Sequence, residues 1–193
     1  LLGICGARAL TRYTFRGKRG MTALIMLPLV LPEIIVAVSL LVVLLQLGFS
    51  LSLVSVTLGH ILMAIPFSIA VLSSSFEGFD RSLEEASLDL GEGPAGTFFR
   101  VTLPMVAPGI LSSLLITFTI SLDEFIVAFF LTGTESTLPI YIWSQLRFTA
   151  KLPHVLALGS VLLLASFILL SVAEVLRQRA AKRAGTGVTG GFL

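Results

Sequence analysis

Long apolar stretches constrain this chain more than any other feature. The sequence is 55% hydrophobic and 12% charged, with a mean hydropathy of +1.01, whereas a soluble domain carries roughly 25% charged residues. A helix that crosses a hydrocarbon core of about 30 Å needs about 20 consecutive, mostly apolar residues. The sequence therefore predicts complete membrane spans over residues 21–47, 53–75, 106–131 and 154–176.

The same stretches predict the fold class. Backbone groups within lipid must be bonded inside the protein, which allows only helices and closed barrels. The strands of a barrel alternate polar and apolar residues, and these stretches show no such alternation. We predict an all-α polytopic membrane protein. Leu1 already lies in an apolar run that ends near Leu10, which indicates part of a fifth span and a fragment that lacks its N-terminal portion.

The basic residues predict which side each connection faces. Cytoplasmic loops of membrane proteins are enriched in Lys and Arg. Of the 13 basic residues, 11 fall in residues 8–20, 76–105 and 177–193, and only Arg147 and Lys151 lie in 132–153. We expect the first three segments in the cytoplasm and 132–153 outside. Residues 1–176 then form one transmembrane domain, and 177–193 form a basic, Gly-rich cytoplasmic tail.

The polar segment 76–105 is longer than a simple connection requires and has its own helical signals. Ser82 and Glu85 have the spacing of a capping box, and Gly91 suits the left-handed residue that ends a helix. Proline is favoured in a first helical turn, so Pro94 predicts a second short helix. We expect a helix–turn–helix protrusion.

Two interpretations of this protrusion are open: a docking site for another protein, or a hairpin that lies on the lipid headgroups. Residues 77–100 carry six acidic and two basic side chains. An anionic cytoplasmic leaflet would repel such a segment, which favours protein docking.

The protrusion also carries a family motif. Glu85-Ala86-Ser87, three residues, Gly91, nine residues and then Val101-x-Leu103-Pro104 resembles the EAA loop of permease subunits of binding-protein-dependent ABC importers. The chain departs from that pattern only at Ser87, where the family has Ala, and at Val101, where it has Ile. The order of the spans around the loop is also similar, although the family usually has six.

Within that family the chain looks most like the spermidine/putrescine permeases of the second-subunit type. The resemblance lies in Phe15-Arg16-Gly17-Lys18, in Leu31-Pro32-Glu33-Ile34-Ile35, and in the stretches 121–133 and 137–144.

The resemblance implies a non-catalytic translocation subunit in the inner membrane, and it implies several partners. They are ABC ATPase subunits docked on the EAA loop, a second permease subunit, an extracytoplasmic solute-binding protein and membrane lipids. The chain has no G-x-x-x-x-G-K-[ST] phosphate loop, so ATP and Mg²⁺ belong to the partner ATPase. Glu85, Ala86, Ser87, Gly91, Leu103 and Pro104 are the expected coupling residues.

Acidic residues within the spans are the candidate substrate pathway. Charged groups there usually face a cavity or a partner, and Glu33, Asp123 and Glu124 would suit a cationic substrate. Adjacent residues of a helix point about 100° apart, so Asp123 and Glu124 are not both expected to face one pore. In the alternative interpretation, Glu33 caps backbone freed by Pro32, and the other two acids lie at the membrane interface.

Other functions fit the sequence less well. A permease for iron, thiamine, phosphonates or opines shares parts of the same stretches. A transporter driven by an ion gradient would show repeated halves with matching broken helices, and no such repeat is visible. The sequence contains neither a metal-ligand spacing nor a nucleic-acid-binding motif, and we expect no cofactor in this chain.

Overall fold

Every regular element in the described part of the chain is a helix. The computed structural model describes the backbone of residues 1–183 and the side chains of residues 1–179, and it contains no strand over that range. The predicted all-α fold is confirmed. The α-helices are α1 (Leu2–Arg12), α2 (Lys18–Val30), α3 (Glu33–Gln46), α4 (Leu53–Glu77), α5 (Ser82–Asp89), α6 (Pro94–Thr97), α7 (Leu103–Asp123), α8 (Ile126–Leu131), α9 (Leu138–Gln145) and α10 (Leu152–Arg183).

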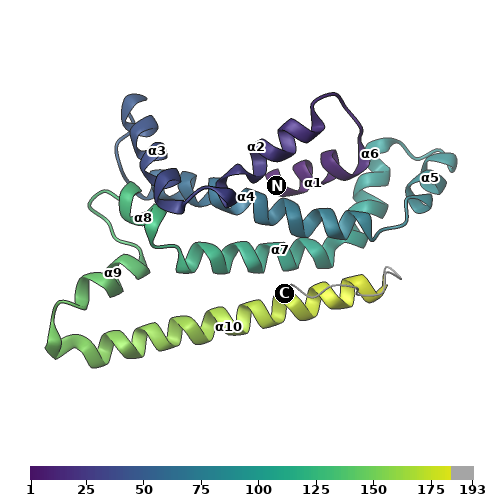
Figure 1. Ribbon diagram of the computed structural model, residues 1–193. Coiled ribbons are helices and arrows are strands. Elements are labelled where there is room, and N and C mark those ends of the chain that lie inside the picture. The colour runs from purple at the N-terminus through teal and green to yellow at the C-terminus, as the bar shows by residue number, and fades with distance from the viewer. Residues whose placement is uncertain (184–193) are drawn as a thin grey trace.

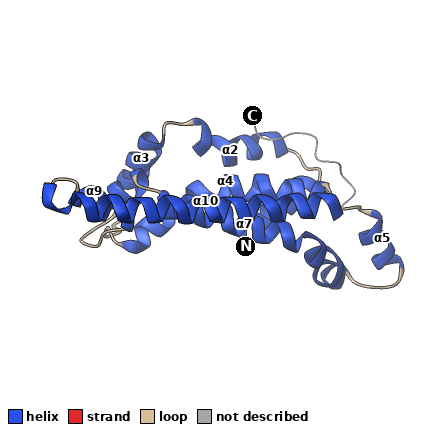
Figure 2. Ribbon diagram, turned by 90° about the horizontal axis from the view of Figure 1, so that it is seen from below, coloured by secondary structure: helices blue, strands red, loops and turns tan. Residues whose placement is uncertain are grey.

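Three long helices form the body of the molecule. Helices α4, α7 and α10 lie lengthwise beside one another, with α7 between the other two (Figure 1). Helix α1 packs on α4. The short helices α5 and α6 project at one end of this body, and α3, α8 and α9 gather at the other end, as the view from below also shows (Figure 2). The molecule therefore has two distinct ends joined by long helices.

The helices have the lengths and compositions of membrane spans. Residues 53–77, 94–123 and 149–179 are each long and apolar enough to cross a membrane, and α2 with α3 makes a fourth span if the bent pair is counted as one. Helix α10 continues past the predicted end of the last span at residue 176 and reaches Arg183. The Gly-rich remainder of the predicted tail, 184–193, lies outside the described residues.

The span predicted over 21–47 consists of two helices with a sharp bend between them. Helices α2 and α3 meet at 108°. A proline disfavours helical backbone at the residue before it, and Leu31, which precedes Pro32, is accordingly extended, with ψ of 146°. The bend places Glu33 in the first turn of α3.

The span predicted over 106–131 is also interrupted. Helix α7 ends at Asp123, Glu124 is extended with ψ of 112°, and α8 begins two residues later. No proline or glycine causes this break. Instead, Glu124 Oε1 accepts a hydrogen bond of 2.9 Å from the Val127 amide and supplies the partner that an amide in the first turn of a helix lacks.

A close contact between α4 and α8 fixes this interrupted region. The Ser55 hydroxyl donates to the Leu131 carbonyl at 2.8 Å. A Cβ atom on Gly59 would lie only 2.5 Å from Val127 Cγ1, so the two helices approach each other where Gly59 has no side chain. Val36, Ala37, Leu44, Val56, Met63, Val127, Ala128 and Leu131 form a small apolar core here.

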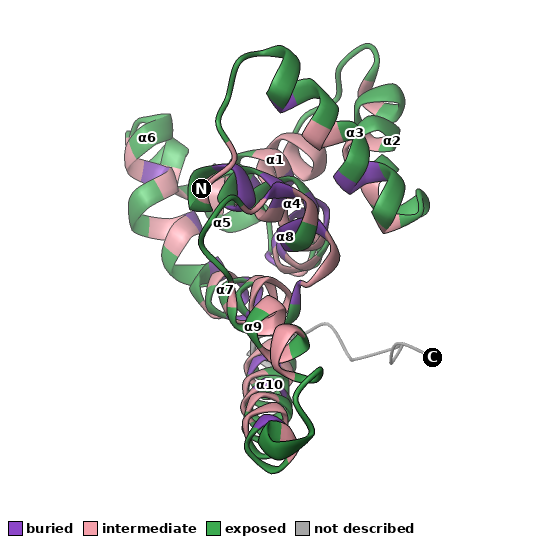
Figure 3. Cartoon of the chain, turned by 90° about the vertical axis from the view of Figure 1, so that its left-hand side faces the viewer, coloured by how far each residue is buried: buried purple, intermediate pink, exposed green. Residues whose placement is uncertain are grey.

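Helix α10 carries a long exposed apolar surface. Only 11% of its most apolar stretch is buried, against 33% for α4, and Figure 3 shows α10 standing out from the remaining helices. Leu163, Leu164 and Phe167 are among its exposed side chains. Such a surface matches lipid or another membrane subunit rather than water.

The segments predicted to be cytoplasmic lie at the same end of the molecule. The α1–α2 connection, the α5–α6 hairpin and the end of α10 lie at one end, and the connection over 132–153 lies at the other (Figure 1). This shared end agrees with the predicted topology.

We predict that position 136 is external and position 90 is cytoplasmic, and both side chains are exposed. In a Cys5→Ser background, an impermeant thiol reagent added to intact cells should label Ser136→Cys and should label Leu90→Cys only after lysis. External labelling of Leu90→Cys in intact cells would reverse the topology.

Candidate functional site

The α5–α6 hairpin is a structured protrusion, as the sequence predicts, but its first helix begins differently. The predicted capping box is wrong: the Ser82 hydroxyl makes no capping bond. Asp80 Oδ1 accepts from the Ser82 amide at 2.9 Å, and that bond lowers the pKa of the Asp80 carboxyl. Glu85 turns outward and pairs with Arg81, at 3.1 Å between Oε1 and Nε.

The end of α5 confirms the role predicted for Gly91. Its φ is +88°, in the left-handed region that favours glycine. The Glu92 amide donates to the Ser87 carbonyl and the Gly91 amide to the Leu88 carbonyl, which is the paired pattern of a Schellman ending. The turn between α5 and α6 is therefore fixed by backbone bonds.

Side chains then hold the two short helices together. The hydroxyls of Ser87 and Thr97 are hydrogen-bonded at 3.0 Å, so Ser87 faces inward rather than outward. The face of α5 that remains accessible combines apolar and acidic residues: Leu83, Glu85, Leu88, Asp89 and Leu90 are exposed, and Leu90 is 89% exposed. An exposed apolar and acidic face of this kind suits a protein partner.

The Leu103–Pro104 pair begins α7, but the helical backbone before it is not interrupted. A π turn over Phe98–Thr102 joins α6 to α7, and residues 94–123 form one continuous helical rod. The rod bends near the π turn, so that α6 turns away from the axis of α7 (Figure 1). The Leu103 amide reaches back to the Phe98 carbonyl. A proline ring clashes with the carbonyl four residues before it in a regular helix, and the wider turn before Pro104 accommodates that ring.

The most enclosed acid of the hairpin is one that the sequence does not single out. Glu84, and not Glu85, points into the protein, where it contacts Arg12 of α1 and Thr102 of the π turn. Its neighbour Glu85 has a side chain 60% exposed, against 15% for Glu84. No spacing rule marks Glu84, because its partners come from distant parts of the chain.

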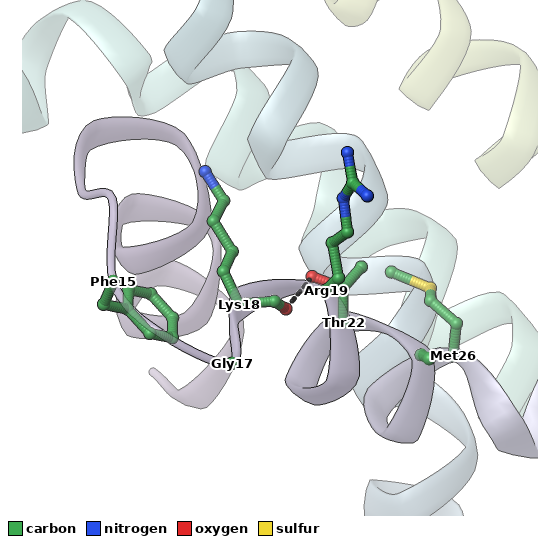
Figure 4. A pocket seen from close by; sticks show the side chains of 7 residues that line it. Phe15, Gly17, Lys18, Arg19, Thr22 and Met26 are labelled. Atoms are coloured by element: carbon green, nitrogen blue, oxygen red, sulfur yellow. Dashed lines mark hydrogen bonds between the residues drawn. The ribbon is translucent and has the colours of Figure 1, made fainter.

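The basic connection before α2 forms a second feature at this end. Gly17 has φ of +86° and begins α2. Lys18 and Arg19 project from the first helical turn, next to Phe15 and Met26, around a shallow hollow (Figure 4). Cationic side chains above apolar ones match a cytoplasmic headgroup region.

At the opposite end, the structure brings two of the three candidate pathway acids together. Glu33 starts α3, Glu124 lies between α7 and α8, and their carboxyl groups lie close to each other. Glu33 is half-buried and Glu124 is 9% exposed. Each acid stands where a span is interrupted, and the apolar core around Val127 lies behind them.

Asp123 lies apart from this pair. Its Oδ1 accepts a 3.0 Å hydrogen bond from the Ser166 hydroxyl of α10, whereas Glu124 faces α3 and α8. The two adjacent acids thus contact different helices, and the expectation that they do not both face one pore stays a prediction. The alternative interpretation of Glu33 as a cap is not supported by any capping bond from its side chain.

His60 makes a structural contact near this site. The Nδ1 atom of His60 shares a 2.8 Å hydrogen bond with the Ser121 hydroxyl, which ties α4 to α7. Among the described residues, no group of His, Cys, Asp and Glu side chains could hold a metal ion.

Apolar helices long enough to cross a membrane, two of them interrupted at acidic residues, fit a membrane transport protein. The comparison with known proteins gives the family. Residues 1–182 match the family described as binding-protein-dependent transport system inner membrane component, and the chain belongs to it. It is thus an inner-membrane translocation subunit of an ABC importer.

Named relatives extend over most of the chain. It is 36% identical to the putrescine transport system permease protein PotI of Escherichia coli K12 over 191 residues, which cover 95% of this chain and 68% of that protein. It is 32% identical to the spermidine/putrescine transport system permease protein PotC of Haemophilus influenzae, over 93% of this chain and 70% of that protein. A probable molybdenum ABC transporter permease protein of Haloferax volcanii is 37% identical over 73% of this chain and 55% of that protein.

Proposed function

We propose that this permease subunit moves polyamines into the cytoplasm and that Glu33 and Glu124 line the path. The observation that carries the proposal is the meeting of these two carboxyl groups at two helix interruptions. Relatives named for putrescine and spermidine support the same substrate class.

The chemistry of the pair fits an ammonium group. Two carboxylates close together repel each other, and a cation between them offsets that repulsion. The same charges offset part of the desolvation of an ammonium group that leaves water for a low-dielectric path. A polyamine carries several such groups along one chain, so more than one of them can meet an acidic pair.

The other end of the chain would receive the energy input. In this proposal, an ABC ATPase docks on the exposed face of α5, and ATP and Mg²⁺ act only in that partner. A second permease subunit completes the path, and an extracytoplasmic binding protein delivers the substrate. Glu85, with 60% of its side chain exposed, and exposed Ala86 lie on the docking face. Gly91, Leu103 and Pro104 shape the hairpin behind it.

A different solute is the second candidate, because one relative is named for molybdenum. Two neighbouring carboxyl groups favour a cation over an anion in the path. Uptake assays with unlabelled competitors distinguish these cases, and dependence on ATP distinguishes an ABC importer from a transporter driven by an ion gradient.

We predict that neutralising either acid of the pair slows polyamine uptake. Glu124→Gln keeps an oxygen that can accept from the Val127 amide, so this variant removes the charge without removing the helix cap. Glu124→Gln and Glu33→Gln should each lower putrescine uptake by about tenfold or more, which corresponds to about 1.4 kcal/mol in the transport barrier. Uptake is measured in proteoliposomes that contain the assembled importer, at matched protein levels.

The controls for this prediction are acids outside the pair. Asp123→Asn should be tolerated better, because Asp123 bonds Ser166 instead, and Glu135→Gln in the exposed outer connection should be neutral. Near-normal uptake by both single variants and by the Glu33→Gln/Glu124→Gln double variant would contradict the acidic path and weaken the polyamine assignment.

A separate prediction concerns docking. Gly91→Val places a β-branched residue at φ of +88°, at a cost of roughly 1–2 kcal/mol, and Glu85→Lys reverses a charge on the exposed face. Both variants should insert into the membrane and should retain less ATPase when the importer is purified. Gly93→Ala is the matched control, because Gly93 has φ of −75° and open space at its Cβ position.

Equal ATPase retention by Gly91→Val, Glu85→Lys and the unchanged protein would show that this hairpin is not the docking site.

A further inference from the structure

An arginine at the end of α1 reaches into the base of the hairpin. Arg12 Nε lies 3.3 Å from Glu84 Oε2, as an ion pair without a hydrogen bond at Nε. Arg12 Nη2 donates to the Phe79 carbonyl at 3.2 Å, and the guanidinium lies over the Phe79 ring. The side chains of Arg12 and Glu84 are only 14% and 15% exposed.

Glu84 also contacts the other side of the hairpin. Its second oxygen, Oε1, accepts a 2.6 Å hydrogen bond from the Thr102 hydroxyl. Thr102 is fully buried and ends the π turn that leads into α7. One carboxylate therefore connects α1, α5 and the start of the rod that includes α7.

Helix α1 is itself fixed against α4. A Cβ atom on Gly3 would lie 2.0 Å from Ser68 Oγ, and one on Gly6 would lie 2.7 Å from Ile69 Cδ1. One turn before Arg12, Arg8 lies over the Phe98 ring at 4.4 Å, which adds a second contact between α1 and the π turn. Arg12 and Glu84 therefore connect the hairpin to α1 and to the π turn that precedes α7.

The other two ion pairs of the hairpin are more exposed than the Arg12–Glu84 pair. The Arg81–Glu85 and Arg100–Glu92 pairs join residues within the hairpin and are largely exposed. Exposed pairs contribute little to stability. Removing one partner from an enclosed pair leaves an uncompensated charge, which destabilises a protein much more than the loss of an exposed pair does.

We propose that Arg12 is a positioning residue for energy coupling, which transmits movement of α5 to α1 and α4 through Glu84. The inference rests on the proposed docking of an ATPase on this hairpin. If Glu84 holds α5 to α1 and to the π turn together, displacement of α5 moves both flanking spans as one unit. Without the Arg12–Glu84 contact, α5 still presents the same exposed face, but its movement is shared less completely with α1 and α4.

The test measures the number of putrescine molecules imported for each ATP hydrolysed, in proteoliposomes that contain the assembled importer. Arg12→Gln and Glu84→Gln should keep the ATPase bound and hydrolysing ATP, while this ratio falls by at least about fivefold. The double variant should be little worse than either single variant, because both changes remove the same interaction. Arg177→Gln is the matched control, because it removes an ion pair with Glu174 inside one helix and should leave the ratio unchanged.

Arg12→Lys keeps the inference testable if the glutamine variants assemble poorly. Lysine retains the charge but lacks the planar fork that lets arginine bind two acceptors. The number of putrescine molecules that Arg12→Lys imports for each ATP should therefore lie between the values for the unchanged protein and for Arg12→Gln. An unchanged ratio in these variants would overturn the inference. So would loss of the bound ATPase, since the pair would then shape the docking surface rather than transmit movement. Failure of the unchanged protein to bind an ATPase would instead contradict the proposed function.

Discussion

The continuous helical rod from Pro94 to Asp123 is the element on which the rest of the structure depends. Its 30 residues run from α6 through the π turn into α7 without a break in the helical backbone. One end carries the hairpin and Thr102, and the other end leads directly into Glu124. Because this helical segment is unbroken, both candidate sites share one mechanical element.

Hydroxyl groups make several hydrogen bonds between helices, beside the apolar contacts. Ser112 donates to the Ala173 carbonyl of α10, Ser68 and Ser113 join α4 to α7, and Ser55 joins α4 to α8. Lipid tails are as apolar as leucine, so the hydrophobic effect gives little preference for contact between helices within the membrane. Hydrogen bonds there contribute about 0.6 kcal/mol each on average. A set of modest contacts permits the long helices to shift relative to one another.

Local signals predicted much of the fold from the sequence. Apolar length marked the spans, Gly91 marked the end of α5, and Pro94 marked the start of α6, because each depends on residues close in the chain. The 108° bend was only partly visible, since Pro28 stays inside α2 while Pro32 ends it. Sequence pattern alone does not decide which proline a helix tolerates.

The site was less predictable, because its contacts are distant in the chain. Glu33 and Glu124 were recognised as separate acids, but their meeting depends on how α3 packs against α8. The break at Glu124 has no proline or glycine signal, and the acid that marks it also caps the new helix. Glu84 was overlooked in favour of Glu85, because its partners Arg12 and Thr102 belong to other helices. Similarly, Asp80 replaced the capping group predicted at Ser82.

The central claim is that movement of the hairpin reaches the acidic pair along the rod from Pro94 to Asp123. The most direct measurement is the reactivity of Asp123→Cys, in a Cys5→Ser background, toward an impermeant thiol reagent outside proteoliposomes that contain the assembled importer. Reactivity should change between the nucleotide-free and ATP-bound states of the ATPase, and the change should shrink when Gly91→Val is added. Equal reactivity in both nucleotide states, in a preparation that imports substrate, would contradict the account.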